Sequence, residues 1–464
     1  MPDHISAPGS AAGIPGTAVP QVILVPLKSA LIAGHAHTLP VLVRVQAPDA
    51  GPARTSARRP CHLSLVLDRS GSMSGQPLLE AVRCARHMVD QLLPTDVASL
   101  VVFDDRVRVL VPAQPVGDRQ ALQRALAGIH CGGSTDLHGG WDAGVQSLLP
   151  EAQSAAIARA IVLTDGNANC GELTDPQRIA GHCAAAAARG VTTSTYGLGR
   201  DFNEALMVAM ARAGGGNHYY GDTAADLFEP FAEEFDLISH LYARQVRLSL
   251  ATCPGVGVKM LNDYPVAGGA HTPVITLPDL PFGAEAWVML ELAIPAGFVP
   301  PPGAPLLRAD VTGVSLERAP IAFPDATLAL EGVPPQVWEA LAADPLARAR
   351  LAEVEASRLI EHARALVDCG DWAAVRALIE SARRRFGDQP WVQGVLGQLE
   401  EIAGRRDEAH FGKEAMYSAL KMRSRLAAKD EAVEVFAMAH EASVPRFLRR
   451  DAAQGRKSGR RPSQ

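Results

Sequence analysis

The cysteines of this 464-residue sequence lack the spacing of a disulfide framework or a zinc site, because the seven are scattered and none forms a CxxC pair. No stretch reaches about 18 apolar residues without charge or proline, and the N-terminus holds no basic segment followed by an apolar run. A strong net charge is also missing, at −6 with 20% charged residues. These absences argue against secreted, membrane-spanning and nucleic-acid-coating proteins, and predict a cytoplasmic protein with reduced thiols.

The length exceeds the roughly 250–300 residues at which one hydrophobic core stops growing, so several domains are expected. Changes of pattern along the chain predict the following organisation: a flexible leader (1–19), N-terminal strands (20–50), an α/β domain (60–240), a β-sandwich (241–330), a helical bundle (334–445) and a basic disordered tail (446–464).

The α/β prediction rests on short apolar runs that alternate with amphipathic helical patterns between residues 60 and 240. This alternation is typical of a Rossmann-like, doubly wound, mainly parallel sheet with helices on both faces. In the first helix, a buried face is predicted along Leu79, Val82, Ala85, Met88, Val89 and Leu92, which recur at helical intervals.

The flanking regions predict two further parts. Residues 21–47 contain two strand-like runs, and strand-like runs resume beyond residue 241. Because a small isolated sheet leaves exposed edges, we expect these strands to complete one β-sandwich, with the α/β domain inserted between them. Beyond residue 334, helical patterns broken at glycines predict a bundle. One segment resembles a tetratricopeptide unit, but no second copy supports a solenoid.

Three separated segments carry the candidate chemistry. LVLDRSGSMSG places Asp68 at the end of an apolar strand, with Ser70 and Ser72 in the loop that follows. GGSTDLHGG places Thr135 in a glycine-rich loop, and IVLTDGNAN places Asp165 at the end of a later strand. Because ligands of open α/β sheets bind beyond the carboxyl ends of the strands, these three loops are expected to converge.

The DxSxS spacing, the threonine and the TDG phrase, in this order, resemble the complete metal-ion-dependent adhesion site (MIDAS) of von Willebrand factor type A (VWA) domains. The resemblance covers about 175 residues. It implies that Ser70, Ser72 and Thr135 contact a cation directly, that Asp68 and Asp165 act through water, and that a partner's Asp or Glu completes the coordination. Hard oxygen donors favour Mg²⁺ or Mn²⁺, in preference to Ca²⁺.

Other interpretations of these residues remain open. A lone DxSxS is more often a capped helix start than a metal site, because Asp and Ser are favoured N-cap residues. Asp104, Asp105 and Asp136 are interpreted as loop residues around the site, and Cys131 and Cys170 as passive small residues. The histidines near the loops, His62, His130 and His138, lack metalloprotease spacing and are interpreted as packed or solvated side chains.

Three functions compete. The first is a non-enzymatic, divalent-metal-dependent adaptor or scaffold that binds an acidic residue of a partner protein, and the order of elements resembles bacterial VWA proteins of the inter-alpha-trypsin inhibitor heavy chain and calcium-activated chloride channel homologue type. The second is a Mg²⁺-dependent phosphohydrolase, which the missing GxxxxGK[ST] loop and DxD pair disfavour. The third is an accessory subunit of an AAA+ ATPase. Nucleic acid and membrane are not expected as partners.

Overall fold

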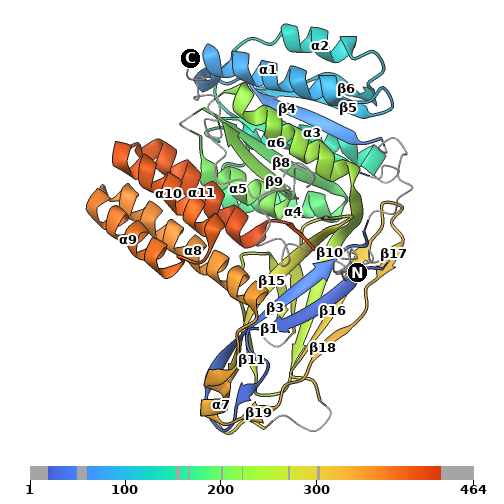
Figure 1. Ribbon diagram of the computed structural model, residues 1–464. Helices are drawn as coiled ribbons and strands as arrows, with labels where there is room; N and C mark the ends of the chain where they lie inside the picture. The colour runs from blue at the N-terminus through green and yellow to red at the C-terminus, as the bar shows by residue number, and fades with distance from the viewer. Residues whose placement is uncertain are drawn as a thin grey trace, which may run out of the picture.

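The computed structural model describes residues 19–49, 60–152, 157–165, 168–199, 202–221, 223–269, 272–299 and 304–429. These residues form an α/β domain, a β-sandwich and a helical bundle (Figure 1). The predicted fold class is therefore confirmed. The predicted leader, apart from Val19, and the predicted basic tail lie outside the described residues.

The α/β domain is built on a six-stranded sheet in the order β6-β5-β4-β7-β8-β9. Its strands are β4 (His62–Asp68), β5 (Val97–Phe103), β6 (Val107–Pro115), β7 (Ala158–Thr164), β8 (Val191–Leu198) and β9 (Gly215–Gly221). Every neighbouring pair is parallel except β5 and β6, which are antiparallel. The sheet is therefore mainly parallel, as predicted.

Helices cover both faces of this sheet because successive residues of a strand point to opposite sides. The helical segments are η1 (Gly71–Met73), α1 (Gln76–Gln91), α2 (Gln120–Ala127), α3 (Leu137–Ala152), α4 (Pro176–Ala188), α5 (Glu204–Ala213) and α6 (Ala224–Ser239). Leu65 and Leu67 share one core with α1, α2 and α6. Val66 and Val162 face the other side, in a core with α3, α4 and α5.

The buried face of α1 differs from the predicted one at its start. Leu79 is 64% exposed, whereas its neighbour Leu78 is buried and Ala81 follows it into the core. The prediction of a buried Leu79 is therefore wrong. Either leucine continues the three- and four-residue spacing, so the spacing alone does not choose between them.

Helix α6 is not among the helices predicted from the sequence. It begins with a capping box, in which the side chain of Thr223 and that of Asp226 each bond the other's backbone N–H. Pro230 lies inside the helix and removes one backbone hydrogen bond. Phe231 and Leu227 are fully buried, so packing against the sheet outweighs the unfavourable proline.

The β-sandwich consists of two sheets. One contains β1 (Gln21–Pro26), β3 (His37–Gln46), β15 (Ala284–Ile294), β11 (Gly257–Met260) and β20 (Ala427–Ala428). The other contains β12 (Val266–Gly269), β13 (Thr272–Thr276), β10 (Leu241–Thr252), β16 (Leu307–Val314), β17 (Pro320–Ala322), β14 (Leu280–Pro281) and β18 (Ala326–Leu328). A small pair, β2 (Leu31–Ile32) and β19 (Gly332–Val333), lies apart from them.

Strand β3 pairs antiparallel with β15 over ten residue pairs, from Gln46–Glu285 to His37–Ile294. The two strands flank the whole α/β domain in sequence, so the domain is an insertion within the sandwich. Alternation along β3 sends Val43 into the core between the sheets and Leu42 toward the helical bundle.

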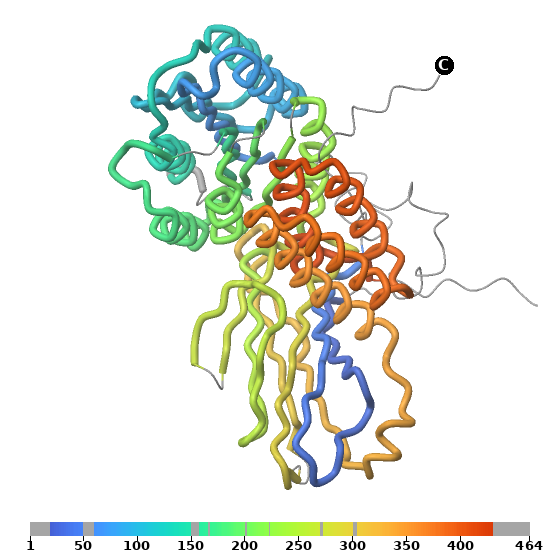
Figure 2. Tube along the Cα trace, turned by 90° about the vertical axis from the view of Figure 1, so that its left-hand side faces the viewer, coloured from blue at the N-terminus to red at the C-terminus, as the bar shows by residue number. Residues whose placement is uncertain are grey.

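The helical part contains α7 (Pro335–Ala340), α8 (Pro345–Asp368), α9 (Trp372–Arg385), α10 (Pro390–Arg405) and α11 (Glu408–Ser424). The helices α8 to α11 share one core. Figure 2 shows the bundle in orange and red, lying against both the α/β domain and the sandwich where the two meet.

The amino ends of the parallel strands face the sandwich. Arg159, at the start of β7, lies 3.8 Å from Asp279 of the sandwich. Arg244 of β10 donates to the carbonyl oxygen of Gly190, just before β8, at 3.0 Å. The carboxyl ends of the strands, where the candidate metal residues lie, therefore form the edge away from the sandwich. No helix in the described part of the chain is long and apolar enough to cross a membrane.

Candidate metal site

Asp68 ends the buried strand β4, and none of its side chain is exposed. One carboxylate oxygen accepts the backbone N–H of Ser70 at 2.8 Å. The other accepts the hydroxyl of Thr164, at the end of the adjacent strand β7, at 2.5 Å. These two bonds orient the carboxylate at the carboxyl edge of the sheet.

The loop after β4 turns at once into the short helix η1, which brings the two serine hydroxyls together. The Oγ atoms of Ser70 and Ser72 are 3.2 Å apart. Ser70 is buried, whereas Ser72 is exposed, so one hydroxyl reaches the surface. Gly75 ends the loop with φ of +79°, a conformation that glycine adopts without strain.

The loop that carries Thr135 is bonded directly to the serine loop. The N–H of Gly71 donates to the carbonyl oxygen of Gly133, and that of Gly132 donates to the carbonyl oxygen of Arg69, both at 2.7 Å. A Cβ atom at Gly132 would lie 1.7 Å from Oδ2 of Asp104. Glycine at this position therefore permits the close approach of the loop to Asp104, and Thr135 in the same loop is buried.

Asp165 follows β7 and is 8% exposed. Asn169, a few residues further, connects this loop to the threonine loop. Its side-chain oxygen accepts the N–H of Thr135 at 2.8 Å, and its own N–H donates to the carbonyl oxygen of Thr135 at 3.2 Å. All three predicted loops thus meet at one edge of the sheet.

The site concentrates negative charge in a poorly solvated place. The pKa of Asp68 is raised to about 6: burial raises it most, the hydrogen bonds from Thr164 and Ser70 lower it, and the charge of Asp165 raises it. A cation placed among these oxygens would offset both the burial and the repulsion between the two carboxylates.

The neighbouring carboxylates have structural partners. Asp104 is buried and lies 2.6 Å from the guanidinium of Arg69, and it also accepts the N–H of Arg106 at 2.8 Å. Asp136 accepts the N–H of Gly139 at 2.9 Å in the first turn of α3. The side chain of Asp105 is 53% exposed.

The cysteines and histidines contribute no obvious metal chemistry. The Cys131 thiol donates to the carbonyl oxygen of Ser70 at 3.1 Å, and burial, with nearby carboxylates, raises the pKa of Cys170. A raised pKa disfavours a reactive thiolate. His138 instead lies 2.8 Å from His182 of α4, a contact that sequence analysis missed.

The donor set fits a hard divalent cation. The converging side chains offer hydroxyl and carboxylate oxygens, which Mg²⁺ and Mn²⁺ prefer, rather than the nitrogen and sulfur that zinc or copper favours. Among the described residues, no group of three His, Cys, Asp or Glu side chains is arranged to hold a metal. A cation here would therefore depend on the serine and threonine hydroxyls.

Sequence reasoning assigned no role to two residues that support this site, Thr164 of the quoted TDG phrase and Asn169. Both lie in the segment IVLTDGNAN, next to the predicted Asp165. Polar residues at the end of an otherwise apolar strand were the available signal, although their bonding partners depend on loops distant in sequence.

Residues 62–233 match the family model of the von Willebrand factor type A domain. This segment of the chain is therefore a VWA domain, the class that the sheet order and the converging loops also indicate.

The relatives found by sequence each match less than half of this chain. An uncharacterized protein of Synechocystis sp. is 28% identical over 197 residues, which cover 42% of this chain and 46% of that protein. The uncharacterized protein YfbK of Escherichia coli is 27% identical over 195 residues, 42% of this chain and 34% of that protein. Inter-alpha-trypsin inhibitor heavy chain H4 of Homo sapiens is 30% identical over 190 residues, 38% of this chain and 20% of that protein. The chain thus spans less than half the length of each.

Two solved structures share the fold over most of this chain. A von Willebrand factor type A protein from Catenulispora acidiphila superimposes with a TM-score of 0.67 at 16% identity, covering 88% of this chain and 97% of that one. The ArnB paralog VWA2 from Sulfolobus acidocaldarius gives 0.55 at 19% identity, covering 88% and 98%. At these identities the likeness extends to the fold alone.

Proposed function

We propose that the protein is a divalent-metal-dependent binding protein, an adaptor or scaffold that captures an acidic residue of a partner protein. The observation that carries the proposal is the direct bonding of the serine loop to the threonine loop, together with the 3.2 Å separation of the Ser70 and Ser72 hydroxyls. VWA domains typically mediate protein interactions, which supports the same conclusion.

In this proposal, Ser70, Ser72 and Thr135 hold Mg²⁺ or Mn²⁺ directly, whereas Asp68 and Asp165 hold it through water and orient the hydroxyls. The bound cation would supply an electrophilic position for a carboxylate from outside. Ser72 is exposed at this edge, so its hydroxyl is accessible to a partner.

A binding role is favoured over phosphoryl transfer by the charges around the site. Phosphoryl transfer needs cations that stabilise the phosphoryl oxygens. Arg69, a cation beside the site, is already paired with the buried Asp104. We therefore propose that the protein is not an enzyme. We also propose that it is cytoplasmic, in keeping with seven cysteines that form no disulfide in the described chain.

The test is affinity capture with the full chain as bait. Wild type in Mg²⁺ is compared with wild type in chelator, with Asp68→Ala in Mg²⁺, and with Asp118→Ala, an exposed aspartate of the same domain, as the matched control. We expect a partner that is retained by wild type and the control but lost in chelator and in Asp68→Ala. An AAA+ ATPase among such partners would identify the protein as an accessory subunit.

Two results would contradict the proposal. One is a set of partners that neither the chelator nor Asp68→Ala changes. The other is metal-dependent hydrolysis of p-nitrophenyl phosphate that Asp68→Ala abolishes, since this would make the site catalytic.

A further inference from the structure

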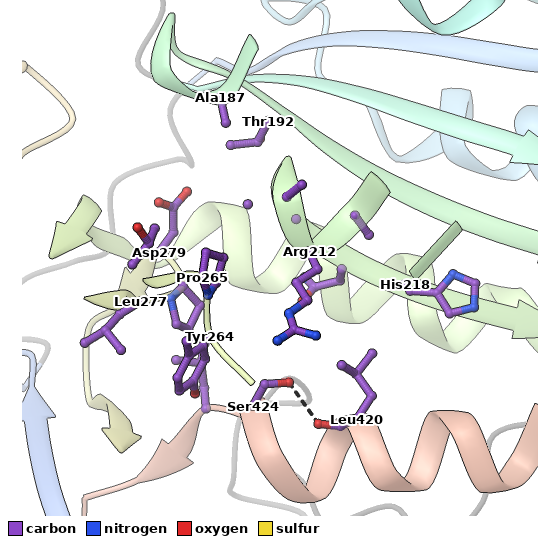
Figure 3. A pocket seen from close by; sticks show the side chains of 18 of the residues that line it. Ala187, Thr192, Arg212, His218, Tyr264, Pro265, Leu277, Asp279, Leu420 and Ser424 are labelled. Carbon is purple, nitrogen blue, oxygen red and sulfur yellow. Dashed lines mark hydrogen bonds between the residues drawn. The ribbon is translucent and has the colours of Figure 1, made fainter. Parts of the chain in front are cut away.

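A cavity of about 390 Å³ lies where the three parts of the molecule meet (Figure 3). Its wall is formed by α4, α5 and the start of β9 from the VWA domain, by β10 and the segments around β12 and β13 from the sandwich, and by the end of α11 from the bundle. Small-molecule sites commonly measure about 300–1,000 Å³ and occur between domains. The size and position of the cavity therefore suit a small ligand.

Most of the cavity wall is apolar, and much of it is made of small side chains. Ala187 of α4 and Ala211 of α5 lie on the VWA side, whereas Pro265, Leu277 and Leu420 come from the sandwich and the bundle. Larger side chains on α4 and α5 would fill the space that these alanines leave. The wall thus suits the apolar body of a ligand.

The charged residues of the wall are mainly cationic. Seven cations, Arg159, Arg212, Arg244, Arg247, Lys421, Arg423 and Arg425, face three acids, Glu233, Asp263 and Asp279. Three further acids pair with some of these cations: Glu234 with Arg159, Glu353 with Arg425 and Glu361 with Arg423. Seven cations in the wall thus face six carboxylates in or beside it, an excess of one positive charge.

Arg212 is the best placed of these cations. Its guanidinium points into the cavity in Figure 3, and its side chain is 39% exposed. It lies 3.8 Å from Asp263, a carboxylate that Arg423 approaches more closely, at 2.6 Å. Burial lowers the pKa of Arg212, Asp263 opposes this shift, and the charge of Arg423 adds to it. Glu361 also opposes the shift, and an anion bound at this guanidinium would further offset the burial and the charge of Arg423.

We infer that the cavity binds an amphipathic organic anion, whose apolar body lies among the small side chains of α4 and α5 and whose carboxylate or phosphate accepts hydrogen bonds from Arg212. Such a ligand would contact all three parts of the molecule at once, so it would hold them in one arrangement. The site lies at the amino ends of the sheet strands, opposite the candidate metal site, and does not depend on the function proposed for that site.

The probe is 1-anilinonaphthalene-8-sulfonate, an amphipathic anion that fluoresces when it enters an apolar site. We expect saturable binding with one dye per chain and a rise in the thermal midpoint of unfolding. The neutral analogue N-phenyl-1-naphthylamine, which lacks the sulfonate, is expected to bind at least tenfold more weakly. Competition with decanoate and with adenosine monophosphate then distinguishes a carboxylate from a phosphate head group.

Two variants and two controls locate the binding. Arg212→Ala is expected to raise the dye Kd at least tenfold, whereas Arg178→Ala, an exposed arginine of α4 outside the cavity, leaves it unchanged. Ala187→Phe is expected to block binding by filling the cavity. Ala185→Phe, on the exposed side of the same helix and outside the cavity, is expected to leave dye binding unchanged.

Three outcomes would overturn the inference. The first is equal dye binding in wild type, Arg212→Ala and Ala187→Phe, and the second is equal affinity for the neutral analogue. The third is that neither decanoate nor adenosine monophosphate displaces the dye. Circular dichroism of each variant separates a lost site from a lost fold.

Discussion

The hydrogen bond from Thr164 to Asp68 joins two adjacent strands at the candidate metal site, and both side chains are fully buried. A buried carboxylate oxygen that loses its donor retains the cost of its desolvation. The stability of this edge of the sheet therefore depends on the threonine of the TDG phrase, to which the sequence analysis assigned no contact with the metal.

We predict that Thr164→Val, which keeps the shape of the side chain but removes the donor, lowers the free energy of unfolding of the VWA domain by about 1–3 kcal/mol. Urea unfolding of the full chain measures the change. Thr327→Val, at an exposed position of β18, serves as the control and is expected to change it by less than about 0.5 kcal/mol. Equal effects of the two substitutions would contradict this role of Thr164.

His218 makes stability depend on pH. Burial lowers its pKa to about 3 from the ordinary 6.5, and its ring nitrogen Nδ1 lies 2.9 Å from the Thr195 hydroxyl. Between these two values the unfolded chain binds a proton that the folded chain does not, so acid favours unfolding. The loss of folding free energy that His218 causes is absent above pH 6.5. It grows by about 1.4 kcal/mol for each pH unit below 6.5.

Between pH 7 and pH 5, we therefore predict that the free energy of unfolding falls by about 2 kcal/mol less in His218→Gln than in wild type. Thermal or urea unfolding at several pH values measures it. His35→Gln, an exposed histidine of the sandwich, is the control and should retain the wild-type pH dependence. The same acid sensitivity in His218→Gln and wild type would assign the effect to other groups.

At the scale of residues, the sequence located the polar loops but not their connections. Asp68, Ser70 and Asp165 stand at strand ends that an apolar pattern reveals. The contribution of Thr164 depends on the register between β4 and β7, which the local sequence does not encode. The position of Asn169 likewise depends on the path of a distant loop.

At the scale of elements, α6 and β7 are joined by a buried ion pair. Arg159 and Glu234 are almost completely buried, and Glu234 also accepts the Ser194 hydroxyl at 2.6 Å and the Asn217 amide at 2.7 Å. Burial alone would raise the pKa of Glu234, but the charge of Arg159 and these hydrogen bonds hold it below its ordinary value. The helix that leads the chain out of the VWA domain is thereby attached to the sheet.

We predict that Glu234→Gln destabilises the VWA domain by about 3–5 kcal/mol, because it removes the closer counter-charge of the buried Arg159 and leaves only Asp279, 3.8 Å away. The double variant Arg159→Met with Glu234→Met should be more stable than Glu234→Gln, since no unpaired charge remains. A double-mutant cycle by urea unfolding measures both effects. Exposed Arg384→Met, whose pair with Glu380 lies at the surface of the bundle, should cost less than about 1 kcal/mol. Similar losses at the buried and exposed pairs would contradict the argument.

The elements themselves were largely predictable where a regular apolar period repeats, as in the parallel strands. Helix α6 was not, because Pro230 interrupts its pattern and burial of Phe231 and Leu227 compensates for it. The buried face of α1 was predicted correctly at Ala85, Met88, Val89 and Leu92 but not at its start, because Leu78 and Leu79 satisfy the same spacing.

At the scale of the whole molecule, the insertion of the VWA domain into the sandwich followed from a simple requirement. The N-terminal strands needed partners, and the strands after the domain supplied them through β3 and β15. The cavity between the three parts could not be predicted in this way, because its wall combines side chains from segments that are connected only by the final packing.

Calorimetric titration of the full chain with Mg²⁺ and Mn²⁺ is the decisive measurement for the proposed divalent-metal site. We expect wild type and Ser74→Ala, a control in the same loop, to bind one ion per chain. Ser70→Ala combined with Ser72→Ala should weaken binding at least tenfold while the fold remains intact by circular dichroism. No binding by wild type, or equal binding by the double variant, would contradict it.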